Sequence, residues 1–145
     1  MAIRVRGLAG AYVKVPGLKK DTGSWAICHG IFNPVICVDA TLPITAGYNA
    51  LVYHEYYHAI RRHKLKELTL LFFAPLVVGL IAWAFYRRYI EYAADRFAYK
   101  MYGDTEYRSF LYLHKEPSGW WAKFKYGATR KARYERVTGK AWVVT

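Results

Sequence analysis

Two histidines and a glutamate stand close together in the segment His54-Glu55-Tyr56-Tyr57-His58. On a helix, residues four apart lie on one face a turn apart, so both imidazoles could reach one metal ion. Histidine nitrogens are favoured zinc ligands and can occupy adjacent corners of a tetrahedral site. Glu55 would flank that metal, where a carboxylate can accept a proton from water and deliver one to a leaving amine. The pattern predicts zinc-dependent hydrolysis, although so short a motif also occurs in helices whose histidines only pack.

A catalytic zinc site requires a third protein ligand. One class of zinc peptidases extends the motif to HExxHxxGxxH, but Arg61 and Lys64 occupy the positions of its glycine and last histidine, which excludes that class. His63 lies five residues after His58. On a continuous helix this spacing places His63 about 140° round from His58, so His63 is a poor ligand.

Glu91 is the better candidate for the third ligand. It precedes Asp95 by four residues, so the two carboxylates share one face of a helix. Glu91 could ligate the metal while Asp95 hydrogen-bonds the far nitrogen of a histidine ligand. The competing interpretation is a solvated acidic pair beside Arg87, Arg88 and Arg96.

Two helical segments must position these residues. The first helical pattern runs from about residue 45 to 71, with Thr45 as the expected N-cap. A second helix is expected to begin near Pro75, a residue suited to a first turn, and to run to about Met101. Gly103 is the expected stop signal.

The stretch 68–86 carries no charge and could be interpreted as a membrane span. A single span would separate Glu91 from His58 by roughly 30 Å, so that one metal ion could not join them. A helical hairpin that turns near Pro75, midway between the histidines and Glu91, removes this conflict. The hairpin 61–88 would then carry an uncharged tip above a basic collar. Such a tip could contact an anionic membrane surface, or pack on the C-terminal segment or a second copy of the chain.

The region before the first helix predicts β-structure. Short strands are expected at residues 11–15 and in a β-hairpin, Trp25–Asp39, that turns at Asn33-Pro34. If this hairpin is symmetric about its turn, Cys28 and Cys37 face each other and could form a disulfide. A reduced pair is the expectation in a cytosolic protein. The strand 35–38 is a candidate edge to which an extended peptide substrate could add.

Composition predicts one globular domain spanning residues 1–145. The chain has 145 residues, 54% of them apolar, and a formal net charge of +12. Two cysteines are too few for a disulfide framework, and the N-terminus shows no secretory pattern. We therefore expect a cytoplasmic protein, or one at the cytoplasmic face of a membrane. The excess of positive charge indicates an acidic partner or simply a basic solvated surface.

The two motifs together resemble the gluzincin metallopeptidases of the HtpX and CAAX-prenyl-protease type, and more closely their small soluble relatives, the minigluzincins. The resemblance is carried by HEYYH, with the strand-to-helix stretch before it, and by Tyr89-Ile90-Glu91-Tyr92-Ala93-Ala94-Asp95-Arg96-Phe97-Ala98. It covers roughly residues 25–116 and implies an α+β, minimal zincin-like fold. In that fold a β-hairpin or small antiparallel sheet packs on an active-site helix and an antiparallel glutamate helix. The resemblance also implies a metalloendopeptidase acting on peptide or protein substrates, with one Zn²⁺ on His54, His58 and Glu91 and with Glu55 as general base and acid.

Other interpretations stay open. The segment 117–145 is basic and interleaved with aromatic residues, so the chain could be a membrane-surface or nucleic-acid-binding protein with a structural or vestigial zinc site. The same segment could instead pack its tryptophans on the core. A latent enzyme whose own terminus covers the cleft is a further possibility. The oligomeric state and the substrate preference are not encoded in any motif of the chain.

Overall fold

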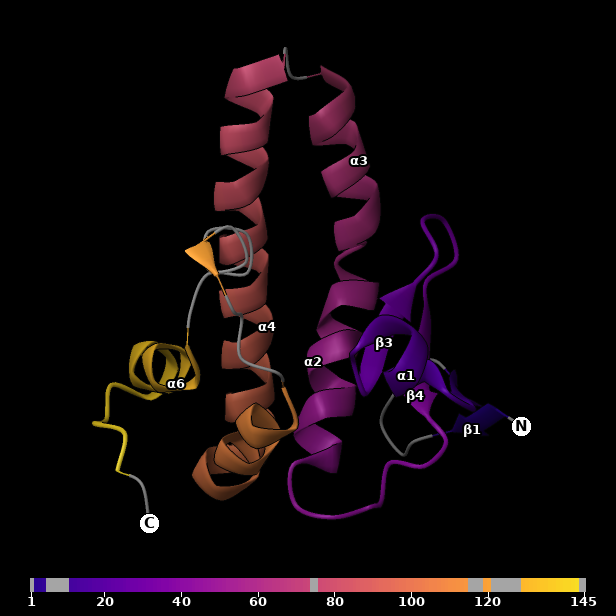
Figure 1. Ribbon diagram of the computed structural model, residues 1–145, viewed down its shortest axis with the longest axis vertical. Helices are drawn as coiled ribbons and strands as arrows, with labels where there is room; N and C mark the ends of the chain where they lie inside the picture. Colours follow the sequence, from indigo (N-terminus) through magenta and orange to yellow (C-terminus); the bar gives the residue numbers. More distant parts are fainter. Residues whose placement is uncertain (1, 5–10, 74–75, 115–118, 121–128, 144–145) are drawn as a thin grey trace.

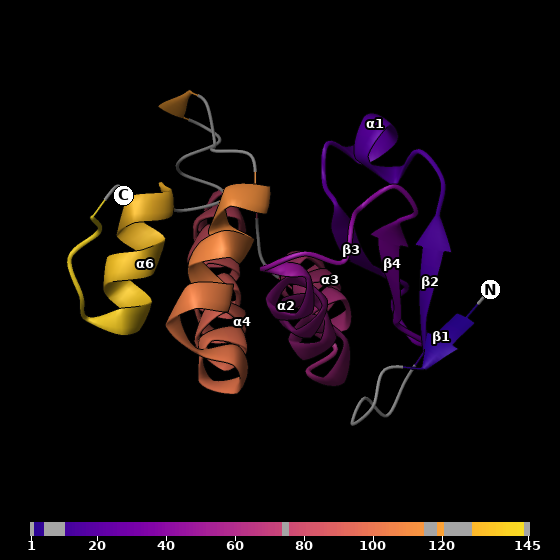
Figure 2. The same cartoon turned by 90° about the horizontal axis from the view of Figure 1, so that it is seen from below.

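The computed structural model describes residues 2–4, 11–73, 76–114, 119–120 and 129–143. The described chain is α+β, as expected, with a small sheet on one side of a bundle of helices (Figure 1). In chain order the elements are β1 (Ala2–Arg4), β2 (Ala11–Val15), α1 (Leu18–Thr22), β3 (Ala26–His29), β4 (Val35–Asp39), α2 (Tyr48–Ile60), α3 (His63–Phe73), α4 (Leu76–Leu113) and α6 (Arg130–Thr138). Seen from below, α6, α4, α2 with α3, and the sheet lie side by side in that order (Figure 2).

The sheet has the strand order β1-β2-β4-β3, with β2 parallel to β4 and the other pairs antiparallel. The expected strand at 11–15 and the expected hairpin at 25–39 are both confirmed. The substrate edge expected at 35–38 is wrong, because β4 pairs with a strand on each side. Among the described strands, β3 is the edge that faces the helices, since it contacts α2 (Figure 2).

The register of the β3–β4 hairpin separates the two cysteines. Ile27 lies opposite Cys37, and Cys28 lies opposite Ile36. Successive side chains of a strand point to opposite faces, so Cys28 and Cys37 lie on different faces and do not face each other. The connection between the strands, residues 30–34, is centred on Phe32 rather than on Asn33-Pro34, and in the resulting register the two cysteines are offset by one residue. Both thiols are free.

Helix α2 begins at Tyr48, and its N-cap is Gly47 rather than the expected Thr45. Gly47 has a left-handed φ of 88°, and a Cβ at this position would lie 2.5 Å from the backbone nitrogen of Phe110. The Gly47 N–H donates to the Glu106 carboxylate at 2.7 Å. This close approach between α2 and the end of α4 sets the start of the helix, and it is a contact between residues far apart in the sequence.

The continuous helix expected from 45 to 71 is broken into α2 and α3 at Arg61 and Arg62. Arg62 has a positive φ of 50°, which L-residues seldom adopt within a helix. The break changes the direction in which α3 presents its first residue, His63.

Helices α3 and α4 form the expected antiparallel hairpin, which extends away from the sheet (Figure 1). Helix α3 ends at Phe73 and α4 begins at Leu76, while Pro75 itself lies outside the described residues. Gly103 interrupts α4 with φ 77° and ψ −169°, so the expected stop is confirmed and a further helical segment, 104–113, follows. No helix in the described part of the chain has both the length and the apolar character needed to cross a membrane.

The C-terminal helix α6 packs against α4 and shares in the core. Tyr134 is 1% exposed, and its ring packs against Trp142, which also lies against Tyr112. Packing on the core is therefore confirmed for Trp142, whereas Trp120 is exposed and Trp121 lies outside the described residues. The buried core includes residues beyond the stretch 25–116, at Tyr12 and Tyr134.

Candidate metal centre

The two histidines of the motif converge inside the protein. His54 is almost fully buried and His58 is 11% exposed, and their Nε2 atoms lie 3.2 Å apart. Both side chains leave the same face of α2, one turn apart, as their spacing predicts. The neighbouring face of α2 packs on the sheet and on α4, which holds the helix in place.

Glu91 reaches the same point from α4. Its Oε2 lies 3.3 Å from His54 Nε2 and its Oε1 lies 3.6 Å from His58 Nε2. The three side chains offer ligand atoms that all lie within 4.8 Å of one another, so this group could hold a metal ion. The hairpin therefore returns Glu91 to the level of the histidines.

The chemistry of these atoms favours a cation at their centre. His54 Nδ1 lies 2.9 Å from Asp95 Oδ1, and a carboxylate only accepts, so the His54 proton belongs on Nδ1. The lone pair of His54 Nε2 then points toward His58 and Glu91, which are acceptors as well. Three acceptors in a buried space repel one another unless a proton or a metal ion lies between them.

The pKa values of His54, Glu91 and His58 also indicate that the cluster favours a positive charge. Burial would lower the pKa of His54, but contacts with Asp95 and Glu91 raise it to about 10. Burial would raise the pKa of Glu91, but its electrostatic interactions with His58 and His54 and a hydrogen bond from His54 hold it well below its usual range. Burial lowers the pKa of His58 to about 3, which keeps its imidazole neutral, the form that binds metals. The cluster thus holds one positive charge, carried by His54 when no metal is bound.

Glu55 lies beside the cluster, on the side of the sheet. Burial raises the pKa of Glu55 to about 7, against the opposing effects of His54 and of a hydrogen bond from the Cys28 backbone N–H. A carboxyl group with a pKa near neutrality can both accept and return a proton. Cys28 belongs to β3, so the edge strand and Glu55 adjoin each other.

Asp95 links the histidines to the C-terminal helix. The Arg133 guanidinium donates to both Asp95 oxygens, through Nε at 2.8 Å and Nη2 at 2.6 Å. Burial would raise the pKa of Asp95, but Arg133 and His54 hold it well below its usual range. The expected position of Asp95 behind His54 is therefore observed, and Arg133 holds Asp95 there. The sequence pattern missed Arg133, because nothing local distinguishes it from the other basic residues of its segment.

His63 occupies an equivalent position behind His58. The Nδ1 atoms of the two rings lie 2.8 Å apart, and His63 is 6% exposed. If His58 presents Nε2 to a metal, its Nδ1–H donates to His63 Nδ1 and fixes the ring. A continuous helix would have turned His63 away, so the break at Arg61 and Arg62 creates this contact. The spacing predicted that His63 would be a poor metal ligand, and it did not predict the contact of His63 with His58.

His114 is a further histidine near the cluster that sequence reasoning did not select. Its ring centroid lies 5.8 Å from that of His54 and 4.6 Å from that of Phe110. Burial lowers the pKa of His114 to about 3, and its Nδ1 has no hydrogen-bond partner among the described residues. No motif marks this position, since His114 stands alone at the end of α4.

Comparisons of the chain with protein-family models, with curated proteins and with solved structures found no match. The resemblance carried by the two motifs therefore stays an expectation. What the fold adds is the geometry of His54, His58 and Glu91, with Glu55 at their side and Asp95 and His63 behind the imidazoles.

Proposed function

We propose that this protein is a zinc-dependent peptidase whose metal ligands are His54, His58 and Glu91. The observation that carries the proposal is the convergence of the ligand groups: the two Nε2 atoms lie 3.2 Å apart, Glu91 Oε2 lies 3.3 Å from His54 Nε2, and Glu91 Oε1 lies 3.6 Å from His58 Nε2. Ligands at about 2.0–2.2 Å from a tetrahedral zinc ion lie roughly 3.3–3.6 Å from one another. Three protein ligands leave a fourth corner for water, which is the arrangement of catalytic rather than structural zinc.

Glu55 is the proposed general base and acid. A bound zinc ion supplies Lewis acidity and lowers the pKa of a water molecule. Glu55 would accept a proton from the attacking water molecule while the oxygen of that water adds to the carbonyl carbon of the peptide. When the carbon–nitrogen bond breaks, Glu55 returns the proton to the leaving amine. A pKa near 7 suits both steps.

We further propose that an extended peptide lies along the outer edge of β3. An edge strand offers unpaired backbone groups to a substrate in extended form. The Cys28 N–H already donates to Glu55, so this edge of the sheet borders the proposed base. A peptide paired with β3 would therefore pass next to Glu55. This replaces the edge that the sequence suggested on β4.

The C-terminal segment supports the nucleic-acid alternative less than its positive charge alone would suggest. Arg130 donates to the carbonyl oxygen of His114, Arg133 to Asp95, and the Arg136 guanidinium lies over the ring of Tyr92. These cations take part in contacts within the protein. The alternative stays a prediction, and the test below includes its outcome.

Metal analysis combined with peptide cleavage tests the proposal, with Glu55→Gln as the critical variant. We expect purified wild-type protein to bind one zinc ion and to cleave an unstructured protein such as casein. Glu55→Gln preserves shape and should keep the zinc ion but lose activity at least about 100-fold, as expected when a general base is removed. Asp21→Asn removes an exposed carboxylate of α1 and serves as the matched control.

Two results would contradict the proposal. One is the absence of zinc from pure, folded wild-type protein supplied with the metal. The other is Glu55→Gln protein as active as Asp21→Asn. Bound zinc without cleavage of any peptide would favour the structural or vestigial metal site instead.

A further inference from the structure

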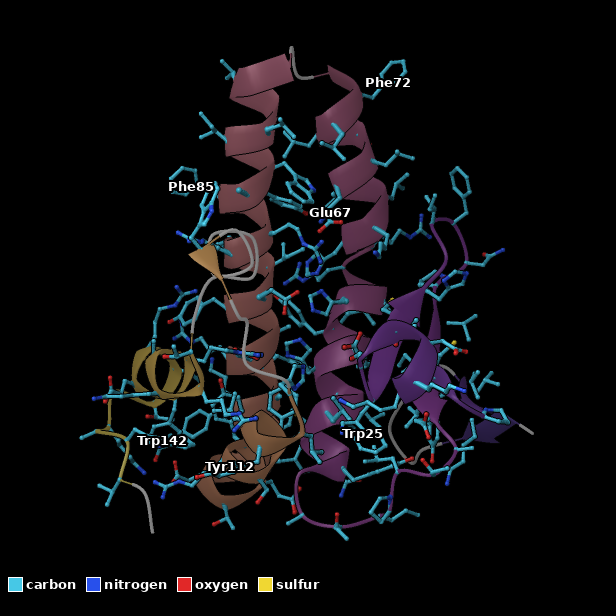
Figure 3. The ribbon with its side chains drawn as sticks, viewed as in Figure 1. Trp25, Glu67, Phe72, Phe85, Tyr112 and Trp142 are labelled. Atoms are coloured by element: carbon cyan, nitrogen blue, oxygen red, sulfur yellow. The ribbon has the colours of Figure 1, made fainter. Side chains whose placement is uncertain are left out.

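The upper part of the α3–α4 hairpin exposes apolar side chains to solvent. Phe72 is 82% exposed, Val78 70% and Phe85 62%. Four further apolar residues on the same two helices are also exposed: Leu68, Leu71, Leu80 and Ile81. Phe72 and Phe85 point away from the hairpin (Figure 3). Large apolar side chains exposed together at one end of a molecule are typical of a place of interaction.

The interior of the same hairpin contains a buried ion pair. Glu67 is 8% exposed and points between the two helices, where its Oε1 lies 3.1 Å from Arg87 Nε (Figure 3). Helices in water normally place apolar residues inside and charged residues outside. This hairpin has a charged pair inside and an apolar outer surface above it. Such an arrangement is stable where the outer surface meets an apolar medium.

Positive charge surrounds the base of the hairpin. Residues 61–88 contain six lysines and arginines against one acidic residue, the buried Glu67. Arg61, Arg62, Lys64 and Lys66 are exposed at the break and in the first turn of α3. Lys66 precedes Phe72 by six residues, which is about 9 Å along a helix. Interfacial helices bury their apolar face about 5–10 Å deep, so these cations would meet lipid phosphates as the tip enters the acyl boundary.

We propose that the upper part of the α3–α4 hairpin, through its exposed apolar residues within 68–72 and 78–85, docks onto an anionic lipid surface. Phe72 and Val78 enter the boundary of the acyl chains. The basic collar, formed by Arg61, Arg62, Lys64 and Lys66, binds the phosphate groups. A second copy of this chain fits the surface less well, because two tips packed together would bring two positive collars close to each other. The proposal does not depend on the metal or on peptide cleavage.

Flotation of the full-length protein with lipid vesicles tests the docking. We expect binding to vesicles that contain phosphatidylglycerol, loss of binding at high salt, and little binding to vesicles of phosphatidylcholine alone. The double variant Phe72→Ser/Val78→Ser should partition at least about tenfold more weakly, because two buried apolar side chains are lost. Phe32→Ser is the matched control, since Phe32 is 72% exposed but lies in the β3–β4 connection.

Charge reversal tests the collar separately. Lys64→Glu/Lys66→Glu should abolish binding to anionic vesicles. Lys20→Glu/Lys100→Glu makes the same change in net charge at exposed positions of α1 and α4, outside the hairpin tip, and should bind nearly as wild type. Circular dichroism of each variant checks that it is folded.

Three results would overturn the proposal. The first is failure of the folded wild-type protein to float with anionic vesicles. The second is equal binding by Phe72→Ser/Val78→Ser and Phe32→Ser. The third is a wild-type dimer that does not float and that Phe72→Ser/Val78→Ser dissociates, which would assign the surface to a second copy of the chain.

Discussion

Helix α4 packs against α2 at its lower end and against α3 at its upper end, and the two ends differ in which side chains they bury. At the lower end, α2 and α4 bury polar side chains between them: His54 is 1% exposed and Asp95 2%. At the upper end, α3 and α4 expose apolar side chains, with Phe72 82% exposed. The buried polar groups around His54 and His58 contact other polar groups, namely Asp95, Arg133 and His63, whereas the upper end exposes large apolar side chains. This difference is the basis of the two proposals, a metal centre at the lower end and a docking surface at the upper end.

The largest expected effect is the loss of metal binding when a ligand at the lower end is removed. His54→Ala should weaken zinc binding at least about a hundredfold, because one of three protein ligands is lost. Zinc titration against a competing chelator measures the change. His29→Ala, at an exposed position of β3, is the control and should bind zinc as wild type. Equal zinc affinity of His54→Ala and His29→Ala would show that the cluster at the lower end does not bind the metal.

Loss of the contact between α6 and the site should destabilise the fold. Arg133→Met leaves the Asp95 carboxylate buried with His54 as its remaining partner at the site, at a cost of about 3–5 kcal/mol. Urea-induced unfolding measures the change in the free energy of unfolding. Lys131→Met alters an exposed residue of the same helix and should change stability little. If both variants unfold alike, Arg133 does not hold the polar cluster together.

Acid should destabilise the metal-free protein through His63. Burial and neighbouring Lys66 lower the pKa of His63 to about 4, whereas a histidine in the unfolded chain titrates near 6.5. The unfolded chain therefore binds a proton as the pH falls below about 6.5, while the folded chain does not until about pH 4, so stability decreases across this window. The contribution of His63 is roughly 1–3 kcal/mol, and His63→Asn should remove it.

Unfolding of wild type and His63→Asn at several pH values measures this effect. The difference in stability between them should change from pH 6.5 to pH 4 and stay constant above pH 7.5, where His63 is neutral in both states. A constant difference across the whole range would show that His63 titrates alike in the folded and unfolded chain.

The smallest expected effect lies at the tip. Phe72→Ala should change the free energy of unfolding in buffer by less than about 0.5 kcal/mol, because an exposed side chain has little packing to lose. Phe110→Ala is the matched variant in the core, where the ring is fully buried, and it should cost about 3–5 kcal/mol. Thermal or urea unfolding compares the two. A large loss from Phe72→Ala would mean that this side chain contributes substantially to the stability of the fold.

Local spacing in the sequence was sufficient for much of this description. The i, i+4 spacing of His54 and His58 brings two nitrogens to one point on any helix. The position of Glu91 requires a reversal of the chain, and α3 and α4 form the hairpin that was expected for this reason. The α+β class, the strand at 11–15 and the stop at Gly103 also follow from local pattern.

Only the tertiary structure decided which residues contact Asp95 and His58. Arg133 reaches Asp95 because α6 packs on α4, and no local pattern separates Arg133 from its basic neighbours. His63 reaches His58 because the helix breaks at Arg61 and Arg62, which the helical pattern did not predict. The cysteine register and the interior position of β4 depend on pairing between strands. Spacing along one element fixes which side chains share a face, whereas contacts between elements depend on how distant segments pack, and that information is spread over the whole chain.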